Sequence, residues 1–232
     1  MTPFELAALL LITAWLAAVA IWFRRSTPVL LGGLIGAGAL TLVAMLLQGV
    51  SLPDLGLDPP RSWLATVALA LAWAAIMYAY SPVADRLASR WFAKPPTLGA
   101  FRAIQESKAK LILGIVVAWA LGGILEELVF RGVLLNAAER GLAGWMPEAA
   151  AALVAIGLAA VGAGVIHLYQ GSRAAAIITQ LSVLFGLLFV VSGHNLWAVI
   201  LCHGVYDTIA FIRFAMKKSK YSNLDGDAEA AS

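Results

Sequence analysis

Residues 122–135 read GGILEELVFRGVLL, so two acidic residues and one arginine stand in the middle of a long apolar run. The run covers about 111–138, which is enough helix to cross the roughly 30 Å hydrocarbon core of a bilayer. Ionisable side chains are costly at that depth and usually mark a site, a pathway or a paired contact. Glu126, Glu127 and Arg131 therefore determine how the rest of the chain is interpreted.

The composition predicts an integral membrane protein. Hydrophobic residues make up 62% of the 232 residues and charged residues only 12%, far from soluble averages. We expect an all-α, polytopic transmembrane helix bundle of about seven spans. It would comprise N-terminal helices with a basic loop (1–110), a helical core (111–216) and a disordered cytoplasmic tail (217–232). The predicted spans are 4–23, 29–50, 63–80, 111–138, 148–168, 174–192 and 195–215.

Lysine and arginine gather on one side of these spans. Thirteen of the sixteen lie in loops that alternate to one face, whereas Arg61 and Arg140 lie on the other and Arg131 lies inside a span. Cytoplasmic loops retain positive charge, so we expect a multi-pass protein of the cell (inner) membrane with its N-terminus outside. The loop Ser81–Lys110 and the C-terminus would be cytoplasmic. We expect lipid headgroups as partners of the basic residues, and no nucleic acid, because no aromatic residues alternate with them.

The two glutamates of the central run should have different surroundings. Glu127 and Arg131 are four residues apart and share one helix face, which predicts a structural ion pair. Glu126 is turned by about 100° from Glu127 and by about 140° from Arg131 on an α-helix. It must therefore find its partners on other helices.

Three further ionisable residues lie in later spans. His167 stands in GVIHLYQ, and His203 and Asp207 stand in CHGVYDT. The spacing of four lets Asp207 accept a hydrogen bond from one ring nitrogen of His203 and leave the other free for chemistry. A lone membrane histidine is often a contact between helices. However, Glu126, His167 and His203 are three ionisable residues on three spans without an evident charge partner, and together they favour a functional site. Tyr169 lies near a span end, where an aromatic belt explains it.

These motifs resemble those of the CAAX prenyl protease and bacteriocin-processing family of intramembrane peptidases, also described as lysostaphin-resistance-like. The resemblance covers about 110–215. The pattern EExxxR is present at 126–131, and a histidine followed four residues later by Asn or Asp is present at 203–207. The middle pattern, FxxxH, is incomplete because Ala163 stands four residues before His167.

The resemblance implies an intramembrane endopeptidase that acts on a membrane-associated peptide or protein. Glu126 would activate a water as general base, His167 would help to hold that water, and His203 would stabilise the oxyanion. The family typically has Asn where Asp207 stands. Because an ionised Asp can only accept hydrogen bonds, we expect Asp207 to orient His203.

The resemblance leaves a cofactor open, although none is favoured. Zinc or another divalent cation is the alternative, because carboxylate and imidazole groups suit such ions. The ligands would be Glu126, His167, His203 and Asp207.

Two other functions could use the same residues. A proton-coupled transporter would be expected to show broken helices or repeated halves, and neither is evident in the sequence. A non-catalytic membrane scaffold would be expected to have lost a member of the catalytic set. The peptidase interpretation is therefore favoured.

An estimate of membrane depth conflicts with a site that Glu126 and His167 share. If the fourth span ends near Ala138 and the fifth begins near Glu148, a rise of 1.5 Å per residue puts Glu126 about 18 Å and His167 about 28 Å from the outer surface. We expect a tilted or late-starting fifth span, or a fourth span that ends soon after Arg131, to close this gap.

The predicted orientation can be tested by cysteine labelling. Cysteines introduced at Ser89 and Ser219 should resist a membrane-impermeant thiol reagent applied to intact cells, because both positions lie on the predicted cytoplasmic side. Both should label after permeabilisation. Labelling of either position from outside would overturn the orientation.

Overall fold

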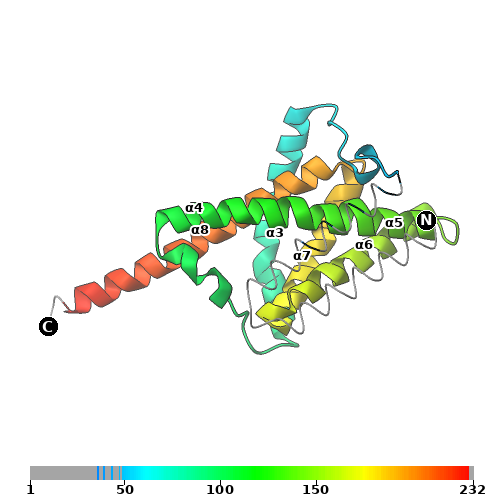
Figure 1. Cartoon of the computed structure of the whole chain (residues 1–232). Coiled ribbons are helices and arrows are strands. Elements are labelled where there is room, and N and C mark those ends of the chain that lie inside the picture. Colours follow the sequence, from blue (N-terminus) through cyan, green and yellow to red (C-terminus); the bar gives the residue numbers. More distant parts are fainter. Residues whose placement is uncertain (1–35, 37–38, 40–42, 44–46, 48, 230–232) are drawn as a thin grey trace.

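The structure is a computed structural model that describes residues 49–229 together with 36, 39, 43 and 47, and at Ala100 and 217–229 it describes the backbone alone. This part of the chain is helical and contains no strand, which confirms the all-α prediction (Figure 1). Its helices are η1 (Pro53–Leu55), α3 (Trp63–Ser89), η2 (Gly99–Gln105), α4 (Lys108–Ala118), η3 (Trp119–Glu126), η4 (Leu128–Leu135), α5 (Asn136–Leu142), α6 (Glu148–Ile166), η5 (Leu168–Gln170), α7 (Ser172–Val191) and α8 (Leu196–Glu229).

Five helical segments of the described part are long and apolar enough to cross a membrane, so the chain is a multi-pass membrane protein. They are Trp63–Ser89, Lys108–Leu142, Glu148–Ile166, Ser172–Val191 and Leu196–Met216. They correspond to the last five predicted spans. The predicted span 4–23 lies outside the described residues, as does almost all of 29–50.

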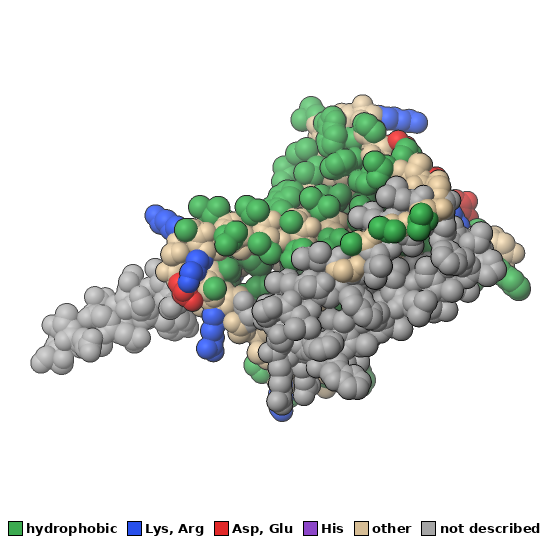
Figure 2. All heavy atoms as spheres, in the orientation of Figure 1, with side chains coloured by type: hydrophobic (Ala, Val, Ile, Leu, Met, Phe, Trp, Pro, Cys, Tyr) green, Lys and Arg blue, Asp and Glu red, His purple; other side chains and the backbone are tan. Residues whose placement is uncertain are grey.

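The outer faces of these helices are apolar. Figure 2 shows hydrophobic side chains along the exposed faces of these helices, with lysine and arginine side chains near the ends of the helices. Leu64 on α3 and Leu113 on α4 are more than half exposed, as are Leu153 and Val161 on α6. Such faces suit contact with lipid rather than water.

Helix α3 is longer than the sequence analysis expected. It begins after Ser62, whose side chain caps the amide of Ala65. It then continues through Pro82 to Ser89, where the sequence predicted a span of 63–80 and a loop from Ser81. Proline removes one helical hydrogen bond, but membrane helices tolerate this where neighbouring groups compensate.

The fourth predicted span is a continuous helical segment, Lys108–Leu142, with two π-helical stretches in its centre. These are η3 and η4, and they contain the acidic motif that opened the sequence analysis. The predicted angles between its residues assumed α-helical geometry, so they do not hold here. Such π-helical turns are frequent at functional sites.

Close helix packing brings α8 against this segment. A Cβ atom added at Gly204 of α8 would lie 2.4 Å from the Trp119 ring, and one added at Gly123 would meet the α8 backbone at 3.5 Å. The Trp119 indole also donates to the Thr208 hydroxyl over 3.0 Å. Small residues thus let the two backbones approach, as is common between membrane helices.

The backbone of α8 is helical as far as Glu229. It therefore includes most of 217–232, for which the sequence analysis predicted a disordered tail. The division of the chain into three parts stays a prediction.

A buried ion pair joins the fourth span to α7. Glu127 and Arg131 are 0% and 1% exposed, and the guanidinium lies 3.1 Å from the carboxylate, as the spacing predicts. Arg131 also donates to the backbone carbonyl and the hydroxyl of Ser182 on α7, over 2.9 and 2.5 Å. Its guanidinium carbon stands 5.3 Å from the centre of the Phe185 ring.

Replacing Arg131 by methionine should destabilise the fold, because it would leave the Glu127 carboxylate buried without its cation. Breaking such a pair typically costs about 3–5 kcal/mol. We expect a clearly lower midpoint of thermal unfolding in detergent. The matched control is Arg140→Met, since Arg140 is exposed and donates a hydrogen bond to the backbone carbonyl of Asp54. Equal unfolding midpoints for the two variants would contradict a structural role for the pair.

Candidate active site

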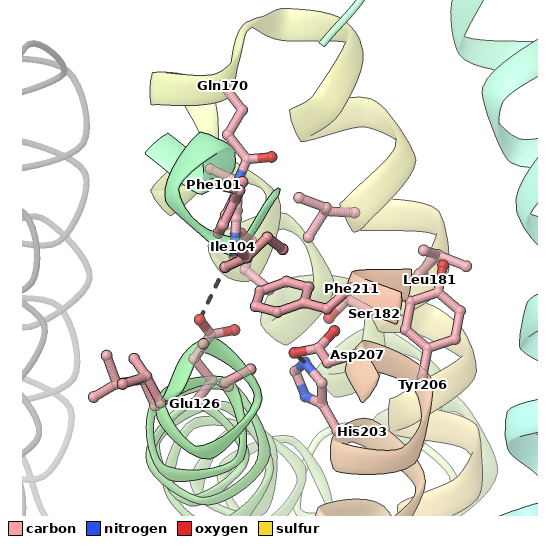
Figure 3. A pocket seen from close by; sticks show the side chains of 18 of the residues that line it. Phe101, Ile104, Glu126, Gln170, Leu181, Ser182, His203, Tyr206, Asp207 and Phe211 are labelled. Atoms are coloured by element: carbon pink, nitrogen blue, oxygen red, sulfur yellow. Dashed lines mark hydrogen bonds and ion pairs between the residues drawn. The ribbon is translucent and has the colours of Figure 1, made fainter. Parts of the chain in front are cut away.

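A pocket of about 600 Å³ lies between the fourth span and helices α6, α7 and α8. Figure 3 shows the Glu126 carboxyl group and the side chains of His203 and Asp207 approaching it from two different helices. The pocket brings together all four residues that the sequence analysis selected as catalytic: Glu126, His167, His203 and Asp207. Their placement in one pocket is what a shared site requires.

Glu126 and His167 face each other at one side of the pocket. The Glu126 Oε1 atom lies 3.9 Å from His167 Nε2, and the two side chains are 13% and 15% exposed. The His167 Nδ1 atom donates to the Ala163 carbonyl over 2.8 Å, because a carbonyl can only accept. In the neutral ring, Nε2 is therefore an acceptor that points toward Glu126.

The discrepancy in depth between these two residues has a simple origin. The fourth span ends at Leu142, four residues later than expected, which puts Glu126 about 6 Å farther from that end of the span at 1.5 Å per residue. Most of the estimated gap of about 10 Å is thereby closed. Of the alternatives offered for closing the gap, a fourth span that ends soon after Arg131 does not occur, since the segment continues to Leu142.

His203 is held chiefly by Glu127, a contact that the sequence analysis did not foresee. Its Nδ1 atom lies 2.5 Å from Glu127 Oε1, whereas its Nε2 atom lies 3.5 Å from Asp207 Oδ2. The ring also stacks on Phe185, with centroids 4.6 Å apart. Glu127 is thus the carboxylate closest to this ring, where the sequence analysis expected Asp207. The contact joins residues of two helices, so no spacing within either helix could reveal it.

Glycine at position 122 allows α8 to come this close. A Cβ atom there would lie 3.0 Å from Asp207 Oδ2 and 3.2 Å from His203 Nε2. Such approaches are tighter than ordinary van der Waals contact. The first glycine of the quoted motif therefore makes room for the polar groups of α8.

Ala163 replaces the aromatic residue of the incomplete FxxxH pattern, and Phe130 lies beside it. Both belong to one small buried cluster with Val129 and Ile166. The Phe130 ring would stand 3.2 Å from a Cβ atom at Gly162. An aromatic ring therefore lies near this position, but it comes from η4 instead of α6.

Two parts of the pocket were not expected. Helix η2 lines it through Phe101 and Ile104, although the sequence analysis placed this stretch in the cytoplasmic loop Ser81–Lys110. Tyr169, interpreted as a belt residue, also lines the pocket and stacks on His167 with centroids 5.9 Å apart. Its position two residues after His167 was the only signal in the sequence.

The pocket was also tested as a metal centre. Among the described residues, no three His, Cys, Asp or Glu side chains are grouped closely enough to hold a metal ion. The alternative ligand set of Glu126, His167, His203 and Asp207 therefore does not fit a divalent cation as it is placed here. A site without a cofactor stays a prediction.

Comparisons with known proteins give a match over the part of the chain that supplies most of the pocket. Residues 108–209 match the model of the family described as type II CAAX prenyl endopeptidase Rce1-like. Neither a search of curated proteins nor one of solved structures gave a match. The matched range contains the four candidate catalytic residues of the pocket and the buried Glu127–Arg131 ion pair. The motif resemblance found in the sequence is thus supported over residues 108–209, where the chain is similar to Rce1-like type II CAAX prenyl endopeptidases.

Proposed function

We propose that the protein is an intramembrane endopeptidase in which Glu126 activates a water molecule to hydrolyse a peptide bond of a membrane-associated peptide or protein. The observation that carries the proposal is the spacing of 3.9 Å between Glu126 Oε1 and His167 Nε2 inside the pocket. This distance is too long for a direct hydrogen bond. It is short enough for one water to bridge both atoms.

A water held in this way is ready for nucleophilic attack. It donates one proton toward the Glu126 carboxylate and the other toward His167 Nε2, so that a lone pair of its oxygen is free. As that oxygen bonds to the scissile carbonyl carbon, Glu126 takes up the first proton. The carbonyl electrons move onto the carbonyl oxygen, which becomes an oxyanion.

His203 supports this negative charge through Nε2. Its Nδ1 atom is occupied by Glu127, and the distance of 3.5 Å to Asp207 is at the outer limit of a hydrogen bond. The Nε2 proton can therefore turn to the oxyanion, as in other sites that stabilise acyl-transfer intermediates. The carbon–nitrogen bond then breaks, and Glu126 returns its proton to the leaving amine.

Asp207 and Glu127 act on His203 and do not touch the reacting atoms. Glu127 fixes the ring through a buried hydrogen bond, and Asp207 lies next to the nitrogen that faces the pocket. Both ring nitrogens lie next to carboxylates, which can only accept hydrogen bonds, so the proposed donor is a ring that has a proton on each nitrogen. Nε2 is then a donor that faces the pocket.

Glu126→Gln is the direct test of the base. Glutamine has nearly the shape of glutamate but cannot take a proton from water, so turnover should fall by at least about 10²–10⁴-fold. The assay is cleavage of a membrane-peptide library by purified enzyme in nanodiscs. The matched control is Glu148→Gln, which alters an exposed glutamate at the start of α6 and should cleave normally. Wild-type turnover by Glu126→Gln would refute the glutamate mechanism.

The same assay tests whether cleavage depends on a metal cofactor. Incubation with a chelator and subsequent removal of the chelator should leave wild-type cleavage unchanged. Loss of activity that a divalent cation restores would show that the expectation of a site without a metal is wrong. That result would leave the assignment as a peptidase intact.

His203→Ala should also lower turnover, by about the 10²–10³-fold typical of a lost oxyanion donor. The unfolding midpoint of the His203→Ala variant must also be measured, because Glu127 loses one of its two hydrogen-bond partners in that variant. His194→Ala is the control, since His194 pairs with Glu139 outside the catalytic pocket. A His203→Ala variant with normal turnover would exclude His203 from catalysis.

A further inference from the structure

The side chains closest to His203 in the proposed site are carboxylates, which accept hydrogen bonds. Both nitrogens of His203 face carboxylates, Glu127 at 2.5 Å and Asp207 at 3.5 Å. Ionised Asp207 and Glu126 can accept hydrogen bonds but cannot donate them. The donor assigned so far to a developing oxyanion is His203 Nε2, which Asp207 also attracts. A second donor would therefore have a clear chemical purpose.

Tyr169 is held at the wall of this pocket. It lies in η5, the turn between the spans α6 and α7, and its ring stacks on His167 at an angle of 29°. Gln170 fixes its hydroxyl oxygen by donating a hydrogen bond from Nε2 over 2.8 Å. Gln170 is itself buried, and its backbone carbonyl accepts from the amide of Thr97 over 2.8 Å. The phenol is thus positioned by a rigid neighbour.

The hydroxyl proton of Tyr169 has no acceptor among the described residues, since the one hydrogen bond of this hydroxyl is the one that it receives from Gln170. Burial raises the pKa of Tyr169 to about 12, so the phenol is neutral and keeps its proton at physiological pH. Accepting a hydrogen bond also makes a hydroxyl a stronger donor. The pocket therefore offers a fixed, protonated donor that nothing in the described part of the chain uses.

We propose that Tyr169 is a catalytic residue whose hydroxyl donates a hydrogen bond to the scissile carbonyl oxygen of the substrate. This inference rests on the proposed peptidase function. As water attacks the carbonyl carbon and the carbonyl electron pair moves onto oxygen, the hydrogen bond strengthens while the proton stays on Tyr169. When the carbon–nitrogen bond breaks, the oxygen becomes a carbonyl again and the bond weakens. Tyr169 and His203 together would form the oxyanion hole.

Tyr169→Phe tests the hydroxyl while it keeps the ring that stacks on His167. We expect kcat to fall by about 10²-fold with little change in KM, because an oxyanion donor acts mainly in the transition state. Tyr80→Phe is the matched control. It removes a phenol hydrogen bond of 3.1 Å to Gln180 outside the pocket and should leave kcat unchanged.

A tetrahedral inhibitor separates catalysis from structure. A peptidyl phosphinate has an oxygen where the oxyanion would form, so its inhibition constant should rise in Tyr169→Phe by the same factor by which kcat/KM falls. A wild-type kcat, or a lowered kcat with unchanged phosphinate affinity, would overturn the role of Tyr169. If Glu126→Gln remains inactive in the same experiment, the failure concerns Tyr169 alone. If Glu126→Gln is fully active, the proposed function itself fails.

A second variant covers the case in which Tyr169→Phe does not fold. Incorporation of 3-fluorotyrosine at position 169 keeps the ring and the hydroxyl but lowers the pKa of the phenol. Because the donor must be protonated, cleavage should then decline at a lower alkaline pH than in the wild type. An unchanged alkaline limit would overturn the proposal.

Discussion

The buried carboxylate of Glu127 is the group on which the rest of the site depends. It is fully inaccessible, and it binds Arg131 of its own helix and His203 of α8. An ionised carboxylate without partners would be very costly at this depth, so both partners must be in place. Arg131 in turn binds Ser182 of α7. One negative charge therefore determines how three membrane helices meet.

Two adjacent glutamates consequently have different tasks. Glu127 is enclosed by cations and positions the imidazole ring, whereas Glu126 lines the pocket and is free to meet water. The π-helical geometry around them changes the direction of successive side chains from that of an α-helix. Local backbone geometry, and not residue type, thus gives Glu127 buried partners and leaves Glu126 at the pocket, where the proposed chemistry needs it.

The sequence predicted the helical class, five of the spans and the membership of the pocket. Contacts within one helix, such as Glu127 with Arg131, follow directly from a spacing of four residues. The contact between Glu127 and His203 joins two helices, and its existence depends on their mutual rotation and separation, which spacing does not specify. The course of α3 through Pro82 was missed for a related reason, because tertiary neighbours outweigh a local helix-breaking signal.

The location of the pocket within an apolar bundle strengthens the chemistry that its few polar groups can perform. Phe101, Ile104 and Phe211 line the same cavity as Glu126, so apolar side chains surround its ionisable groups. Electrostatic interactions are stronger in such a medium than in bulk water, and fixed donors need not reorganise as an oxyanion forms. The same medium makes every unpaired charge costly. The proposed catalysis would thus require the dense packing around Gly122 and Gly204 that brings these helices close together.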